Sequence, residues 1–126
     1  MARSTIPIQQ MIDKYPTLPL TANSADFTFT ASDPVNGDEF PHTGREIIIV
    51  QNTDGVNPHF VMITSVRDRF NRLGTIGDAV ATYSVGANEY AVFPPFPAEG
   101  WRQASNVIYL DSDDAQLLYA VLRLPA

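Results

Sequence analysis

Residues 116–124 read Gln-Leu-Leu-Tyr-Ala-Val-Leu-Arg-Leu, and this stretch does most to decide the fold. Alternate side chains point to opposite faces of a β-strand. Here one face would carry Leu118, Ala120, Leu122 and Leu124, and the other Leu117, Tyr119, Val121 and Arg123. Because both faces are apolar, we expect this last strand to lie in the middle of a sheet. The run Ile47–Val50 is apolar at every position, so we expect both of its faces to be covered as well.

Short apolar runs between turn residues continue along the chain, a pattern typical of all-β folds. Asn52–Pro58 and Gly86–Asn88 have the composition of turns. The predicted strands are Phe27–Thr30, Arg45–Asn52, Phe60–Val66, Ala81–Val85, Tyr90–Phe93, Val107–Asp111 and Gln116–Leu124. A chain of 126 residues fits one domain of ordinary size. We therefore predict an all-β domain at residues 24–126, an antiparallel β-sandwich of jelly-roll-like type, preceded by an N-terminal arm at residues 1–23.

The N-terminal arm has a helical spacing of apolar side chains, at Ile8, Met11, Ile12 and Tyr15. Pro7 suits the first position of a helix. Three interpretations stay open: a short helix at Pro7–Tyr15 folded onto the domain, an arm that is extended toward a neighbouring protein, or a frayed terminus. For the second interpretation, the candidate partner-binding residues are Arg3, Ile6, Ile8, Met11, Ile12 and Tyr15.

The chain is acidic, since eight Lys and Arg residues against fourteen Asp and Glu residues give a formal net charge of −6. Repulsion from phosphate disfavours binding to nucleic acids or to membrane surfaces, so we expect neither as a partner. Residues 1–5 lack the apolar core of a secretory signal, and the longest apolar run is far shorter than a bilayer span. We expect a soluble protein made in the cytosol.

Few residues point to chemistry. The absence of cysteine excludes thiolate metal sites and cysteine nucleophiles. His42 and His59 each follow a proline in a predicted loop, and no Gly-x-Ser-x-Gly or His-Glu-x-x-His motif accompanies them. Asp111–Asp114 lacks the glycine and the distal glutamate of an EF-hand loop, so we interpret it as a solvated turn. We expect no catalytic residue, no cofactor and no metal, and therefore no enzyme.

Two loops are candidates for binding another protein. Arg67–Arg72 holds three arginines and one aromatic residue, too few for a nucleic-acid surface. It is either a solvated loop with internal Arg–Asp pairing or the rim of a protein contact. Phe93–Trp101 combines prolines with aromatic residues of the kind that form interface hot spots, unless Phe96 and Trp101 plug the open end of the sandwich. The candidate residues are Arg67, Arg69, Arg72, Phe93, Phe96 and Trp101.

Several motifs, taken in order, resemble a family of small head proteins of tailed bacteriophages. The first is Phe40-Pro41-His42-Thr43-Gly44-Arg45, which leads into a strand that ends Val50-Gln51-Asn52-Thr53-Asp54-Gly55. The later ones are Tyr83-Ser84-Val85-Gly86-Ala87-Asn88-Glu89, Val92-Phe93-Pro94-Pro95-Phe96-Pro97, Val107-Ile108-Tyr109-Leu110-Asp111 and Tyr119-Ala120-Val121-Leu122-Arg123-Leu124. The opening residues 1–8 are similar too. Asp33–Glu39 and Arg67–Arg72 depart from the family pattern.

The resemblance implies a virion structural protein, a decoration or cement protein on the capsid exterior that is synthesised in the host cytoplasm. Its partner would be the major capsid protein, with self-association on the capsid as a further possibility. One alternative is a component of the head–tail junction or the tail. Another is a carbohydrate-binding module that uses Phe96, Trp101 and Tyr109 for stacking. The fold alone does not separate these functions.

Overall fold

The computed structural model describes residues 2–11, 27–66 and 80–125, and the described residues contain strands and no helix. The strands are β1 (Ser4–Thr5), β2 (Ile8–Gln10), β3 (Thr30–Ala31), β4 (Asp38–Pro41), β5 (Glu46–Asn52), β6 (His59–Thr64), β7 (Val80–Val85), β8 (Tyr90–Phe93), β9 (Val107–Ser112) and β10 (Leu117–Arg123). None of these residues forms a helix that could cross a membrane.

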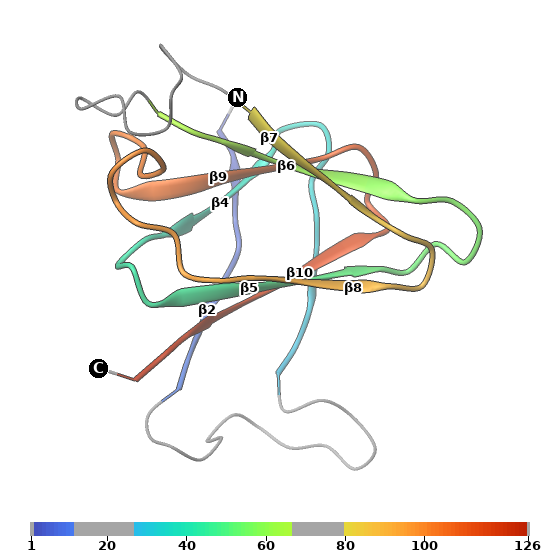
Figure 1. The fold of residues 1–126 in the computed structure, drawn as a ribbon, viewed down its shortest axis with the longest axis horizontal. Coiled ribbons are helices and arrows are strands. Elements are labelled where there is room, and N and C mark those ends of the chain that lie inside the picture. Colours follow the sequence, from blue (N-terminus) through green and yellow to red (C-terminus); the bar gives the residue numbers. More distant parts are fainter. Residues whose placement is uncertain (1, 12–26, 67–79, 126) are drawn as a thin grey trace.

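The strands form two five-stranded sheets that pack face to face as a β-sandwich (Figure 1). Sheet A has the order β1-β4-β9-β6-β7, and sheet B has the order β2-β10-β5-β8, with β3 also paired to β10. Both sheets are mixed, because β1 runs parallel to β4 and β2 runs parallel to β10. The prediction of a sandwich is confirmed, whereas the prediction of purely antiparallel sheets is wrong at these two edges.

The last strand, β10, lies in the middle of sheet B, as predicted from its two apolar faces. β10 lies between β2 and β5, and it pairs with β5 from Leu117 opposite Asn52 to Arg123 opposite Glu46. The inward side chains of these strands form the core together with those of sheet A. The core residues are Ile6, Phe40, Ile48, Val50, Val61, Ile63, Val85, Ala91, Ile108, Leu110, Leu117, Tyr119 and Val121.

The short helix predicted at Pro7–Tyr15 is not formed over Pro7–Met11, where the structure has strand β2 instead. An isolated helix of this length is only marginally stable in water. Backbone pairing with distant strands replaces it: the amide of Ile6 donates to the carbonyl of Glu39 at 2.8 Å, and that of Met11 donates to Arg123 at 2.9 Å. Residues 12–15 lie outside the described residues.

The N-terminal segment, residues 2–11, contributes to both layers. Its blue trace in Figure 1 runs from sheet A, where β1 pairs with β4, to sheet B, where β2 pairs with β10. Between the two strands, Ile6 enters the core and is 1% exposed. The described part of the region predicted as an arm is therefore built into the sandwich.

Candidate partner-binding surface

Four aromatic side chains form a row at the side of the sandwich bounded by β7 and β8. Tyr83 of sheet A and Phe93 of sheet B have ring centroids 5.6 Å apart in an edge-on arrangement. Phe93 stacks on Phe96 at 6.4 Å, and Phe96 packs on Trp101 at 5.0 Å. The structure thus brings together all three aromatic residues that the sequence selected in this loop, and it adds Tyr83.

The aromatic row is largely structural. Phe93, Phe96 and Trp101 are partly buried against the core, as expected if they close the open side of the sandwich. Tyr83, at the outer end of the row, is 51% exposed. The row therefore holds the loop Phe93–Trp101 in place. Of its four rings, that of Tyr83 is the most accessible to solvent.

His42 anchors the aromatic loop from the other side. The Nε–H of Arg102 donates to Nδ1 of His42 at 3.0 Å, so the imidazole proton sits on Nε2, which donates to the carbonyl of Phe96 at 2.6 Å. A second guanidinium nitrogen of Arg102 donates to the carbonyl of His42 at 3.2 Å. Since His42 is buried and both of its ring nitrogens are engaged, it positions the loop and has no nitrogen free for a substrate.

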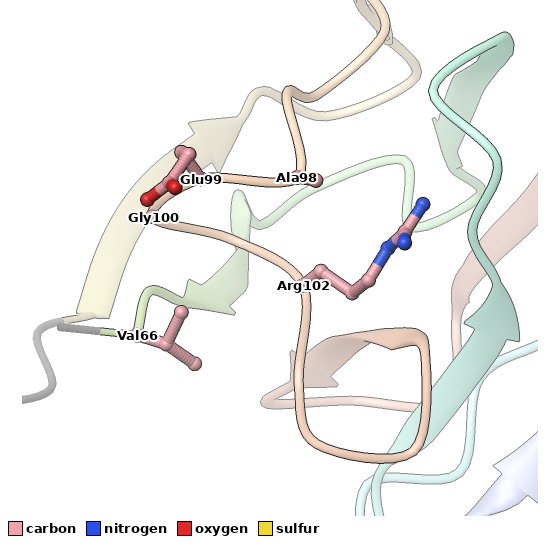
Figure 2. Close-up of a pocket in the computed structure, with 5 residues that line it drawn as sticks. All are labelled: Val66, Ala98, Glu99, Gly100 and Arg102. Carbon is pink, nitrogen blue, oxygen red and sulfur yellow. The ribbon is translucent and has the colours of Figure 1, made fainter. Parts of the chain in front are cut away.

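The open depression beside this loop is not a convincing ligand site. It encloses about 270 Å³ and is lined by Val66, Ala98, Glu99, Gly100 and Arg102. Figure 2 shows the side chains of Glu99 and Arg102 pointing in different directions, and Arg102 is already bonded to His42. Sites for small molecules are usually larger and have convergent polar groups.

His59 has two carboxylate partners and also serves a structural role. Its Nε2 lies 2.9 Å from Oδ2 of Asp54, and its Nδ1 lies 3.2 Å from Oδ2 of Asp113. The hydrogen bond with Asp54, followed by that with Asp113, raises the pKa of His59. The imidazole thereby joins the loop after β5 to the loop after β9. No group of three or more metal-ligating side chains occurs within the described ranges.

The outer face of sheet B is apolar across three adjacent strands. Tyr90 and Val92 of β8 are 60% and 63% exposed, and they lie opposite Gln51 and Ile49 of β5. We call this surface the apolar face; its residues, which alternate with the core residues and surround the polar Gln51, are Ile47, Ile49, Tyr90, Val92, Leu118, Ala120 and Leu122. Ala120 and Leu122 are themselves buried. The ring of Phe29 lies 6.2 Å from that of Tyr90, so part of the face is covered by the chain itself.

The outer face of sheet A differs in character. Its side chains include Glu39, Tyr109, Asp111, Thr82 and Ser84, in register across β4, β9, β6 and β7. The outer face of sheet A is therefore mixed, since Phe60 of β6 is 43% exposed there and Met62 is half-buried, beside these charged and polar residues. The exposed apolar side chains of sheet B are concentrated in β8, at Tyr90 and Val92.

The exposed strand of the apolar face also lies at a sheet edge. Within the described residues no strand pairs with the outer side of β8, whose residues Tyr-Ala-Val-Phe carry no charge and no proline. Charge, proline and bulges are the usual protection of an edge strand against pairing with another chain. β8 lacks charge and proline, and its protection is its short length of four residues.

The remaining predicted residues lie elsewhere. Arg3 donates to Oδ1 of Asp111 at 2.9 Å and its guanidinium carbon lies 4.0 Å from the ring centroid of Tyr109, on sheet A. Ile6 is in the core, Ile8 is half-buried in β2, and Met11 follows β2. Ile12, Tyr15, Arg67, Arg69 and Arg72 lie outside the described residues.

Sequence reasoning missed Tyr83, Tyr90 and Val92. They lie in runs that the sequence predicts as strands, but such a prediction does not give the place of a strand in its sheet, which decides which of its side chains are exposed. Neither a family model, nor a curated protein, nor a solved structure matches this chain.

Proposed function

We propose that this protein is a virion structural protein of a tailed bacteriophage, a capsid decoration or cement protein that binds the major capsid protein. It would be synthesised in the host cytoplasm and attach to the capsid exterior. The proposal starts from the resemblance to small phage head proteins, whose motifs fall on β5, on β8 with its aromatic loop, and on β9 and β10. Nothing in this role requires a cofactor, a nucleic acid or a membrane as partner.

The observation that carries the proposal is the apolar face with its exposed residues Tyr90 and Val92. Burial of apolar area stabilises a contact by about 25 cal/mol per Å², and tyrosine is common among the residues that dominate interfaces. Attachment through this face would leave the outer face of sheet A, which carries Glu39, Asp111 and other polar residues, in contact with solvent. An acidic exterior, consistent with the net charge of −6, helps particles to stay dispersed.

The jelly-roll-like arrangement belongs to this proposal. Successive strands change sheet at β4–β5, β5–β6, β7–β8, β8–β9 and β9–β10. Such alternation between two sheets is a feature of the jelly rolls from which many capsid proteins are built.

A non-enzymatic role agrees with how the reactive side chains are used. His42 and His59 have both ring nitrogens bonded to groups of the protein. The face of Tyr109 carries the guanidinium of Arg3, so this ring and the Phe96–Trp101 pair do not offer one sugar-stacking platform. No comparable observation favours a head–tail or tail component, which stays an alternative.

The proposal is tested by binding to capsid shells that lack tails and lack this protein. The variant Tyr90→Asp/Val92→Asp places two carboxylates on the apolar face without touching the core. We expect its Kd for the shells to rise by at least roughly tenfold, because each hot-spot residue contributes about 1–2 kcal/mol or more. Co-sedimentation with purified shells measures this.

The matched control is Thr82→Asp/Ser84→Asp, which places the same charges on exposed residues of the outer face of sheet A. It should bind shells as the parent does. Equal binding by both double variants would remove the apolar face from the proposal, and binding of the parent to isolated tails but not to shells would favour the tail alternative.

A further inference from the structure

The N-terminal segment is held in the way that a separate extended peptide would be held. β1 adds in parallel to the edge of β4, and β2 adds in parallel to the edge of β10, so one short segment extends both sheets. Addition of a strand to an open sheet edge is a common mode of peptide recognition. The edges of β4 and β10, with the side chains that contact residues 3–10, are called the edge site below.

Every described contact of this segment with the edge site joins residues far apart in the chain. Ser4 donates to Oδ2 of Asp33 at 2.8 Å, and Gln9 exchanges two hydrogen bonds with the backbone of Thr28, at 2.7 and 2.9 Å. The backbone amides of Ser4, Ile6 and Met11 donate to carbonyls on Gly37, Glu39 and Arg123. The contacts therefore do not depend on which copy of the chain supplies the segment.

The edge site is selective for the sequence that it holds. The guanidinium of Arg3 lies against the carboxylate of Asp111 and the ring of Tyr109. Gly37 leaves the space for it, because a Cβ added at Gly37 would clash with the side chains of Arg3 and Asp111. Three residues further on, Ile6 is enclosed in the core. An extended peptide that fits must carry Arg and Ile at this spacing, and a second copy of this chain carries both.

We propose that the edge site is a strand-exchange site: residues 3–10 of one copy bind the edge site of a second copy, which links the copies through both sheets. Exchange of an identical element between protomers keeps all of its contacts, so the balance between the closed and the linked form depends on the local concentration of copies. On a shell, where the proposed function would place many copies side by side, the linked form is favoured. The exchange itself does not rest on that function.

The test uses the full chain and two single-cysteine variants, since the protein has no cysteine of its own. Thr5 and Glu39 are direct partners in the β1–β4 register. The variants Thr5→Cys and Glu39→Cys, one of them isotopically labelled, are mixed, unfolded together and refolded at high concentration under a mild oxidant. We expect a disulfide-linked heterodimer in at least roughly tenfold excess over the control pair, because pairing raises the effective thiol concentration.

The control pair is Thr5→Cys with Ser105→Cys, which carries the second thiol on an exposed residue away from β1. A heterodimer yield equal to that of the control pair would overturn the exchange. The double variant Thr5→Cys/Glu39→Cys should close a disulfide within one chain at low concentration, and its failure to do so would remove the register on which the proposal stands.

No shell is present in this experiment, so it tests the exchange separately from shell binding. Either one can fail while the other succeeds. On particles, a photo-crosslinker attached to the cysteine of Glu39→Cys distinguishes the occupants. Labelling of a second copy of this chain supports the proposal. Labelling of the capsid protein alone would assign the edge site to a capsid segment and overturn it.

Discussion

Glu46 shows how one residue can combine burial with full ionisation. The residue is 1% exposed at the start of β5, and it accepts hydrogen bonds from the backbone amides of Thr43 and Gly44 and from Nε of Arg123. Burial raises the pKa of Glu46, but the hydrogen bonds of Thr43 and the charge of Arg123 outweigh it and hold the pKa at about 2. This carboxylate fixes the turn before β5 to the end of β10.

We predict that Glu46→Gln lowers the free energy of unfolding by about 3 kcal/mol at neutral pH, because Arg123 then loses its buried partner. The folded-state pKa lies below the ordinary value of 4.5, so the contribution of Glu46 is present above pH 4.5 and is lost as the pH falls toward 2. Urea denaturation at pH 7 and pH 3 measures this. Glu89→Gln, at an exposed position, should change little, and a Glu46→Gln variant as stable as the parent at pH 7 would contradict the prediction.

At the scale of elements, a strand could be predicted when its own residues carry the pattern, and not when it forms because of distant pairing partners. The strands that became β5, β6, β7, β8, β9 and β10 were predicted to within two residues, because each is a short run with apolar residues between turn residues. β4 was missed: Asp38-Glu39-Phe40-Pro41 is polar and ends in proline, and it forms a strand because β1 and β9 flank it. β1 and β2 were missed for the same reason, since their pairing partners lie far along the chain.

Only part of the candidate surface could be predicted from the sequence. Phe93, Phe96 and Trp101 were selected from composition, and they do meet. Tyr90 and Val92 were not selected, because their exposure follows from the edge position of β8, which is decided by the order of strands in sheet B. Arg3 and Ile6 were expected to contact a partner, and in this chain their contacts are with its own two sheets.

Neighbouring residues of β5 should respond in opposite ways to the same substitution. Ile48 points into the core and is fully buried, whereas Ile49 belongs to the apolar face. Ile48→Asp buries an unpaired carboxylate at a cost of several kcal/mol, comparable to the stability of a whole domain, and should prevent folding. Ile49→Asp should fold and melt cooperatively, with weakened shell binding. Circular dichroism and thermal melting compare the two, and a folded Ile48→Asp variant would contradict the assigned faces.

At the scale of the whole molecule, the ionisable groups act in opposite directions on stability. Hydrogen bonds hold the pKa values of Asp33 and Asp54, like that of Glu46, at about 2, so stability falls as the pH drops below about 4. Burial raises the pKa of Asp38 to about 6, so its ionisation opposes folding as the pH rises from 3.8 through 6. The stabilisation from His59 is fully present below pH 6.5 and is lost as the pH rises through its raised pKa.

We therefore predict a melting temperature that is higher at pH 5.5 than at pH 8 or pH 2.5. Asp38→Asn should remove the destabilisation that develops between about pH 4 and pH 6, and His59→Gln should remove the decline above pH 6.5. Differential scanning calorimetry of the parent and the two variants across this range measures both effects. A melting temperature that rises steadily to pH 8 in the parent would show that neither group has the surroundings described above.

The position of β9 and β10 also determines when the chain can fold during its synthesis. β9 joins β4 to β6 in sheet A, and β10 joins β2 and β3 to β5 in sheet B, so the late strands lie at the centre of both layers. Until residues 107–123 have left the ribosome, a nascent chain has no template to close either sheet. Pairing between such distant segments is slow, on the order of milliseconds to seconds for sandwich folds. We therefore expect a nascent chain to stay unfolded until both β9 and β10 have left the ribosome.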